Sequence, residues 1–426
     1  MSFRACREIL KVLVEMTKLF VPLQKNNEVM KKIYLTLIFI IPTIFSFAQI
    51  PHLYNHTFPQ VDSQNPKVNE MLEQVDVANI QNYVENLTSF INRRCDGSHI
   101  WDVKDWLVEK YSDFSLNNIQ LFDFQVISYW DTIPKPFTTA PNVLAIQIGK
   151  TKPEEYIICG AHYDSWVNAE EPYDVDTLRS PGADDNASGV SGILETARIL
   201  SNYDFERTII YANWNAEEMG LCGSNEYAKQ CQRDSLDIVA YFNLDMTGYV
   251  NPGDFVHIHL LYTPCDSLLG NFVKQVSHTY LPEINICQAW LMHGDTDYSS
   301  FNRHGYQAIS PSEDVNYLSP YIHTVDDIIG LSVNSWEQAE MFTKLNLASV
   351  AIAAGPLFES VDEIDDKDVL VESYEVFDIF GRPVLSEKNV WKNMEEIPVT
   401  DLQTGIYIIR FFMQDGNVVT KKFIKR

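Results

Sequence analysis

The sequence is short of positive charge. Its 426 residues hold 32 Lys and Arg against 58 Asp and Glu, which gives a formal net charge of −26. A surface this acidic argues against a nucleic-acid partner and indicates good solubility. Apolar residues are not scarce, at 46% hydrophobic and 12% aromatic, so the chain can build a large packed core. Its length allows two or three domains.

Cysteine is also scarce, and two common catalytic signatures are missing. Seven cysteines, none in a C-x-x-C pair, are too few for a disulfide scaffold. If the chain is exported, Cys222/Cys231 and Cys265/Cys287 are the nearest pairs that could bridge, and buried free thiols are the alternative. No G-x-S-x-G or Walker A pattern occurs in the sequence. Serine-hydrolase and P-loop functions therefore find no support.

The N-terminal region has the pattern of a secretory signal. Met30 and two lysines precede the apolar residues 33–47, and small residues stand three and one positions before a cut after Ala48. Because signals begin at the first residue, we expect Met30 to be the true start, with residues 1–29 an upstream extension and 30–48 a cleaved signal peptide. An uncleaved membrane anchor is the alternative, although about 15 residues are few for a span. Residues 49–75 are then an N-terminal segment or a short propeptide.

The sequence changes character after residue 357. Residues 358–371 are predicted to be an acidic linker. Residues 372–426 contain short β-rich runs at 374–382, 405–412 and 418–424, separated by turn residues. This pattern predicts a small C-terminal β-sandwich.

The tail resembles the C-terminal sorting domain of the type IX (Por) secretion system. The resemblance rests on Gly381-Arg382, on Leu402-x-x-Gly405-Ile406-Tyr407 and on the Lys-rich end at 421–426. It implies the type IX machinery as a partner, export through the periplasm and outer membrane, and a secreted or cell-surface location, with no stable membrane span after signal cleavage. A carbohydrate- or protein-binding β module is the alternative.

Helical and strand patterns alternate in the middle of the chain. Helical spacing of apolar residues occurs at 77–94, 100–111, 190–201 and 224–232, and strand-type runs occur at 122–128, 142–149, 156–161, 208–214 and 238–244. Some runs are apolar throughout, as expected of strands covered on both faces. The alternation predicts an α/β fold with a mixed, largely parallel central sheet flanked by helices. Ligands bind beyond the carboxyl ends of the strands in such sheets.

Polar residues follow three of these strands directly. His162, the pair Glu217-Glu218 and Asp245 each come just after an apolar run, so three strands direct polar groups to one edge of the sheet. His162 could offer a ring nitrogen to a metal, and Asp164, on the same face, could accept the other ring N–H. A lone histidine is more often structural, so His162 decides little by itself.

Adjacent carboxylates make a metal more plausible. Asp184-Asp185 lies in a glycine-flanked turn before a helix, and such a pair without a basic neighbour is costly unless a cation is bound. Helix capping is the alternative for this turn, and it is compatible with metal binding. The side chains of Glu217 and Glu218 diverge, so one could bind metal while the other moves a proton.

A second histidine lies farther along the chain. His323 occupies a loop before a helix predicted around 328–351, and Asp326 or Asp327 could orient its ring. Two histidines and three carboxylates supply the nitrogen and oxygen ligands that zinc accepts.

In this order, the segments resemble the co-catalytic di-zinc aminopeptidases of the leucyl aminopeptidase and aminopeptidase Y type. The resemblance covers about residues 76–357. It is carried by His162-Tyr163-Asp164-Ser165, Gly182-Ala183-Asp184-Asp185-Asn186-Ala187-Ser188-Gly189, Ala216-Glu217-Glu218-Met219-Gly220, Asn243-Leu244-Asp245-Met246 and His323-Thr324-x-x-Asp327. It implies a zinc exopeptidase fold that acts on peptides with a free N-terminus.

The resemblance also assigns roles. His162 and Asp245 would hold one Zn²⁺ ion, Glu218 and His323 a second, and Asp185 would bridge the two. Glu217 would be the general base and acid, with Asp164 as a further catalytic residue. The implied reaction is hydrolysis of the N-terminal peptide bond by a hydroxide shared between the metals.

The segment 295–306 resembles the substrate-side loop of the same family. Asp297 and Tyr298 are therefore expected to contact substrate, although the family more often has Asp-His where this chain has Asp297-Tyr298. His293 could stabilise an oxyanion.

Three alternatives stay open at this point. Glutaminyl cyclases share the fold but generally need three of the five ligand positions, whereas all five are filled here. An exported binding protein without activity is a second alternative, and the presence of Glu217 argues against it. The pattern His257-x-His259 could chelate a metal, but it has no evident carboxylate context, which favours a structural role.

Overall fold

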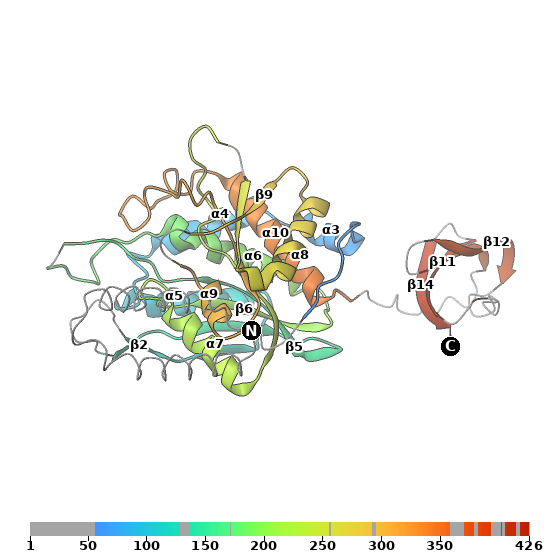
Figure 1. Ribbon diagram of the computed structural model, residues 1–426, viewed down its shortest axis with the longest axis horizontal. Coiled ribbons are helices and arrows are strands. Elements are labelled where there is room, and N and C mark those ends of the chain that lie inside the picture. The colour runs from blue at the N-terminus through green and yellow to red at the C-terminus, as the bar shows by residue number, and fades with distance from the viewer. Residues whose placement is uncertain are drawn as a thin grey trace, which may run out of the picture. The chain divides into compact units, whose positions relative to one another are not determined.

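The apolar runs of the middle region assemble into an eight-stranded sheet. The computed structural model describes residues 56–127, 136–170, 172–254, 257–291, 295–357, 370–378, 382–392, 402, 405–414 and 418–425. These residues fall into two compact units that divide between Pro356 and Leu357 (Figure 1). The predicted signal peptide, most of the acidic linker and His293 lie outside the described residues. None of the helices within those ranges has the length and apolar character that a membrane crossing requires.

The sheet of the larger unit is mixed. Its order is β1 (Ile119–Phe122), β4 (Asn142–Gln147), β6 (Arg207–Trp214), β5 (Lys152–His162), β7 (Asp237–Asn243), β10 (Ala308–Ser312), β8 (His257–Leu261) and β9 (Asn285–Ala289). The central strands β6, β5, β7 and β10 run parallel to one another. Strands β1 and β4 are antiparallel to their neighbours, β8 is antiparallel to β10, and β9 is parallel to β8. This confirms the predicted α/β class, and a small hairpin of β2 (Gln125–Ile127) and β3 (Pro136–Thr138) adds to it.

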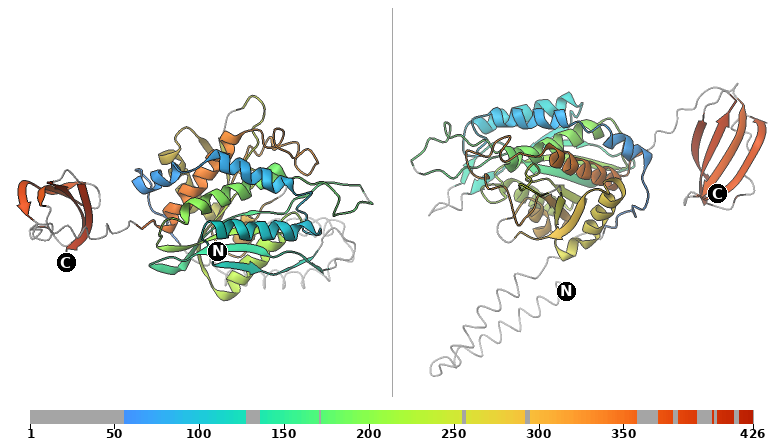
Figure 2. Two further views of the ribbon diagram at one scale, coloured as in Figure 1. Left: turned by 180° about the vertical axis from the view of Figure 1, so that it is seen from behind. Right: turned by 90° about the horizontal axis from the view of Figure 1, so that it is seen from above.

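Helices cover both faces of the sheet (Figures 1 and 2). One face packs against α3 (Pro66–Leu72), α4 (Val77–Ser89), α5 (His99–Asp113), α6 (Gly189–Leu200), α8 (Ser267–Tyr280) and α10 (Trp336–Ala354). The other face packs against α7 (Cys222–Asp234) and α9 (Tyr298–Arg303). In β5, Ile157 and Cys159 enter the first core, whereas Ile158 between them enters the second. Strands buried on both faces therefore carry apolar residues at successive positions.

Two helix boundaries differ from the sequence-based expectation. Helix α4 ends at Ser89 rather than continuing to residue 94, because Phe90 is extended and Asn92 forms a bridge with Ser180. Helix α10 begins at Trp336 rather than near residue 328. Its first turn is capped by Ser335, whose side chain accepts a hydrogen bond from the main-chain N–H of Gln338.

The smaller unit is all-β, as predicted. Its antiparallel sheet has the order β12 (Pro383–Lys392), β11 (Val371–Asp378), β13 (Gly405–Met413) and β14 (Val418–Lys425). One side carries a small core that includes Val371, Tyr374, Val376, Tyr407, Ile409, Phe411 and Met413. The described strands of this unit form one sheet rather than the two facing sheets of a sandwich. Strand β12 was not predicted, because its residues are mostly exposed and lack an apolar pattern.

The cysteines of the larger unit do not form the first suggested bridge. Cys222 and Cys231 lie on the same helix, α7, and both are thiols, as are the buried Cys95 and Cys159. Burial raises the pKa of Cys231 to about 12, so this thiol is unreactive at neutral pH.

The central position of α6 leads to a stability prediction. Ile193 of α6 is fully buried in the first core, so Ile193→Ala removes packed methylene groups that its neighbours cannot replace. We expect a loss of about 2–5 kcal/mol of unfolding free energy. Leu268→Ala on α8, at a side chain that is 55% exposed, is the matched control and is expected to change stability by about 0.5 kcal/mol or less. Urea unfolding followed by tryptophan fluorescence measures both, and equal losses would contradict the assignment of the core.

Candidate metal centre and active site

Five separate segments place polar side chains beyond one edge of the sheet. His162 is the last residue of β5, and Asp245 follows the end of β7. Glu217 and Glu218 lie in the turn between β6 and α7. The remaining segments are η2 (Ala183–Ser188), which precedes α6, and the loop between β10 and α10. The strand ends, the η2 turn and this loop therefore converge where α/β sheets bind their ligands.

The side chains form two groups that share Asp185. Nε2 of His162 lies 3.1 Å from Oδ1 of Asp185 and 3.4 Å from Oδ1 of Asp245. Nε2 of His323 lies 3.1 Å from Oδ2 of Asp185 and 3.0 Å from Oε2 of Glu218. In each group the possible ligand atoms lie within 4.8 Å of one another. The structure thus brings all five predicted ligands together, with one oxygen of Asp185 facing each group.

Two buried carboxylate oxygens of the cluster lack a hydrogen-bond partner in the part of the chain that the structure describes. Oε1 of Glu218 and Oδ1 of Asp245 are buried and have no hydrogen-bond partner among the described residues. Burial disfavours a charged ring at His162, but Asp245 and other neighbouring carboxylates raise its pKa well above the ordinary value. Hydrogen bonds to the carboxylates of Asp185 and Glu218 raise the pKa of His323 to about 11. Both shifts show that the cluster favours added positive charge, and a set of imidazole and carboxylate donors fits zinc.

Glu217 and Glu218 differ in their surroundings. Burial, with the charge of Asp185, raises the pKa of Glu218 to about 7, although its hydrogen bond to His323 opposes the shift. Glu217 belongs to neither group but lines the same pocket. Burial raises its pKa well above the ordinary value, and the nearby His162 lowers it in part. Glu217 is therefore a buried carboxyl group with a raised pKa that lies beside the two groups without belonging to either.

Asp164 fixes the turn that holds the two glutamates. Its Oδ1 accepts a hydrogen bond from the N–H of Glu217 at 3.1 Å, and its Oδ2 accepts one from the N–H of Glu218 at 3.2 Å. Nδ1 of His162 lies closer to the main-chain carbonyl of Asp164, at 3.2 Å, than to its carboxylate, at 3.5 Å. The expected support of His162 by Asp164 thus comes mainly from the main chain.

Side chains also hold the η2 turn in place. Asp327 accepts hydrogen bonds from the N–H groups of Asp184, at 2.9 Å, and Asp185, at 3.2 Å. Asp326 or Asp327 was a candidate to orient His323, but the carboxylate of Asp327 instead binds the main chain of Asp184 and Asp185. Asn186 donates to the carbonyl of Leu244 at 3.0 Å and accepts from the N–H of Gly189 at 3.0 Å. It therefore starts α6 and joins η2 to the segment that carries Asp245.

Arg93 supports the site and was missed by the sequence analysis. It is fully buried, and its guanidinium donates to the carbonyls of Tyr163 at 2.9 Å, Pro181 at 2.5 Å and Gly182 at 2.8 Å. Burial lowers the pKa of Arg93 to about 10, while Asp327 and other carboxylates oppose the shift. Gly182 has φ of 53°, and a Cβ there would lie 2.8 Å from Nη2 of Arg93. One arginine thus joins the loops that carry His162 and Asp185.

Thr296 is a second residue that the sequence analysis gave no role. Its hydroxyl donates to Oδ2 of Asp245 and accepts a hydrogen bond from Nδ2 of Asn243 at 2.9 Å. The neighbouring Asp297 is fully buried, and burial raises its pKa to about 7, against the influence of His162. Tyr298 packs against the second core. Neither Asp297 nor Tyr298 is among the residues that line the pocket, so their predicted substrate contacts stay predictions.

A pocket of about 220 Å³ opens over the two groups. Its polar lining includes Asp185, Glu217, Glu218, Asp245 and His323, and its apolar lining includes Met246, Leu261, Leu291, Leu318 and Ile322. The pocket thus combines a few convergent polar groups with apolar side chains, the usual form of a small-molecule or side-chain binding site.

Comparison with known proteins identifies the class. Residues 142–350 match the model of Peptidase family M28, and residues 360–426 match that of the Secretion system C-terminal sorting domain. The chain therefore carries a region similar to the M28 peptidases, followed by a region similar to the sorting domain. The predicted metallo-aminopeptidase class is confirmed at family level, and the sorting domain confirms a type IX route to the cell surface or beyond it.

Individual relatives agree with this class. A probable leucine aminopeptidase of Trichophyton verrucosum is 28% identical over 296 residues, which cover 68% of this chain and 76% of that protein. The LapA aminopeptidase structure of Legionella pneumophila is 25% identical with a TM-score of 0.59, over 72% of this chain and 79% of that one. A glutaminyl cyclase of Bacteroides thetaiotaomicron, at 19% identity and a TM-score of 0.51, covers 65% of this chain and 98% of its own and shares the fold alone.

The contacts of Arg93 lead to a prediction. Arg93→Met keeps much of the apolar stem but leaves the carbonyls of Tyr163, Pro181 and Gly182 without a donor, at about 1–3 kcal/mol for each buried group. We expect a loss of at least about 3 kcal/mol of unfolding free energy in metal-free protein, measured by urea unfolding. Arg303→Met, at a side chain that is 52% exposed, is the control and should stay within about 0.5 kcal/mol. A loss no larger than that of the control would show that Arg93 does not hold the loops together.

Proposed function

We propose that this protein is an exported di-zinc aminopeptidase. His162 and Asp245 would hold one zinc ion, Glu218 and His323 the other, and Asp185 would bridge them. The observation that carries the proposal is the placement of Asp185, whose two oxygens each lie 3.1 Å from a different imidazole. Unsatisfied oxygens on Glu218 and Asp245 support the same assignment. Zinc, when bound, supplies Lewis-acid activation of water and of the scissile carbonyl.

The chain's own residues would then divide the remaining work. Glu217 lines the pocket and belongs to neither group, so it would be available to take a proton from the attacking water and give it to the leaving amine. Burial and neighbouring carboxylates raise its pKa, and His162 opposes the shift in part, which brings the carboxyl group toward the working range of a base near neutral pH. Asp164 would hold Glu217 in position through the main chain.

The proposal includes the route of export. Residues 30–48 would be removed as a signal peptide, and the C-terminal domain would direct the protein through the outer membrane. The substrates would then be peptides outside the cell with free N-termini. The apolar pocket walls favour an apolar side chain on the first residue.

If Glu217 transfers protons and does not bind metal, its substitution should reduce activity without reducing zinc content. Glu217→Gln keeps the shape of the side chain but cannot accept the proton, so kcat should fall by about 10²–10⁴-fold. Zinc content, measured by mass spectrometry of the metals, should not change. Glu226→Gln on α7, at a partly exposed side chain paired with Lys229, is the matched control and should keep full activity. Loss of zinc together with activity would instead make Glu217 a ligand.

The pocket walls predict a substrate preference. An aliphatic side chain gains about 1–3 kcal/mol over a smaller one in an apolar pocket, which corresponds to about 10–200-fold in kcat/KM. Leucine p-nitroanilide should therefore be cleaved faster than the glycine or aspartate derivative, with activity lost on chelation. Leu291→Asn should reduce this preference, whereas Leu331→Asn, at an exposed position, should not. Cyclisation of N-terminal glutamine without p-nitroanilide release would replace the aminopeptidase proposal with a glutaminyl cyclase.

A further inference from the structure

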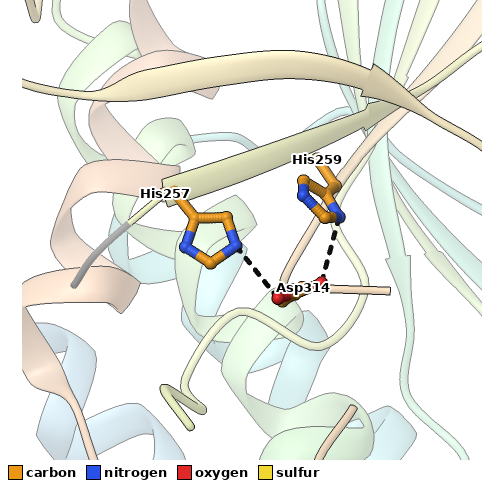
Figure 3. Close-up of side chains that lie close together, drawn as sticks. All are labelled: His257, His259 and Asp314. Carbon is orange, nitrogen blue, oxygen red and sulfur yellow. Dashed lines mark ion pairs between the residues drawn. The ribbon is translucent and has the colours of Figure 1, made fainter. Parts of the chain in front are cut away.

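A third group of possible metal ligands lies apart from the two that share Asp185. His257 and His259, two residues apart on β8, point to the same side of the strand, and Asp314 from the segment after β10 lies between their rings (Figure 3). The three ligand atoms lie within 4.8 Å of one another. From the sequence, this pair of histidines was expected to have a structural role, because no carboxylate context was evident. The structure supplies that carboxylate from a residue distant in sequence, so the basis of the assignment was wrong.

The distances fit a coordination shell better than hydrogen bonds. Nε2 of His257 lies 3.6 Å from Oδ2 of Asp314, and Nδ1 of His259 lies 3.4 Å from Oδ1. Both exceed the normal range of an N–H···O hydrogen bond. Zinc bonds of about 2.0–2.1 Å in a tetrahedral arrangement place neighbouring ligand atoms about 3.3–3.5 Å apart. The His259 gap falls within that range and the His257 gap lies just above it, each measured to a different oxygen of Asp314.

The protonation state of the group also suits a metal. Nδ1 of His259 accepts a hydrogen bond from the N–H of Val315 at 3.1 Å, so this nitrogen carries a lone pair. Neutral imidazole and ionised carboxylate are the forms that bind metal, and a bound ion would replace the Val315 hydrogen bond.

The group lies on the sheet face that continues into the pocket. His259 pairs with Ser312 of β10, and Leu261 pairs with Ser310, while Leu261 and both serines line the pocket. Side chains at alternate positions of a strand share a face. His259 and His257 therefore lie on the same face of β8 as Leu261, at increasing distance from the pocket. Asp314 begins the segment that leads from β10 to His323. An ion held here would join the start of that segment to β8.

We propose that His257, His259 and Asp314 bind one divalent transition-metal ion, of the zinc class, at a site that shares no ligand with the two groups around Asp185. Two imidazoles and one carboxylate are the donors that this class prefers over calcium or magnesium, which take oxygen ligands. Three protein ligands leave one position for water or for a group of an approaching peptide. The partial exposure of the three side chains, at 12–16%, gives the ion access from solvent.

Metal counting on the full chain tests this proposal. Protein is stripped with a chelator, equilibrated with zinc at a buffered free concentration and analysed for bound zinc per chain. His259→Ala and Asp314→Asn should each bind about one equivalent less than the unchanged chain, because either change removes one of three ligands. His278→Ala, an exposed histidine on α8, is the control and should bind the full number. Equal zinc content in the unchanged chain, His259→Ala and Asp314→Asn would overturn the proposal.

A double variant that lacks the proposed di-zinc centre distinguishes zinc bound at this site from zinc bound around Asp185. His162→Ala combined with His323→Ala removes one ligand from each group around Asp185. That chain should still bind about one equivalent, which His259→Ala should abolish. Circular dichroism and the thermal midpoint confirm that each chain is folded, and Asp314→Asn, a change of charge without change of size, provides the mildest test. A difference of one equivalent in the unchanged background would support the new site even if the di-zinc proposal failed.

Discussion

The position of one carboxylate, that of Asp185, determines how the rest of the site is built. Its two oxygens face two imidazoles that come from a strand end and from a distant loop. Asp185 lies three positions after Gly182, which has a left-handed backbone conformation, and its N–H donates a hydrogen bond to Asp327. Asn186 joins η2 to the segment that carries Asp245, and Asp327 joins η2 to the loop that carries His323. The turn around Asp185 is thus the point at which the positions of both groups are set.

Much of the architecture could be predicted because the relevant signals are local. Apolar runs over 156–161, 208–214 and 238–244 gave the central strands, and polar residues just beyond them gave His162, Glu217 and Asp245. The C-terminal end of α4 and the start of α10 were placed less well. The extended conformation of Phe90 ends α4, and the capping hydrogen bond of Ser335 starts α10, at positions that the apolar spacing does not mark.

The unpredicted parts of the site depend on contacts between residues far apart in sequence. Arg93 donates to carbonyl oxygens, and any residue type can supply a carbonyl, so its partners leave no pattern in the sequence. Asp314 meets His257 and His259 only because β10 and β8 are antiparallel neighbours. Asp327 was recognised as part of a motif, yet its partners are N–H groups in η2 rather than the nearby histidine. In each case the residue is visible in the sequence, but its partner depends on which distant segments the fold brings together.

The carbonyl partners of Arg93 have a consequence for the metal-free protein. The guanidinium holds the loops of Tyr163 and Gly182 together without using any of the ligand side chains. It also leaves a fixed positive charge next to the carboxylates of Asp327, Asp164 and Asp185. The contacts of Arg93 therefore keep the frame of the site assembled without metal, with part of the repulsion among its acids offset. For the proposed di-zinc centre, the order of events would then be assembly of the frame first and metal binding second.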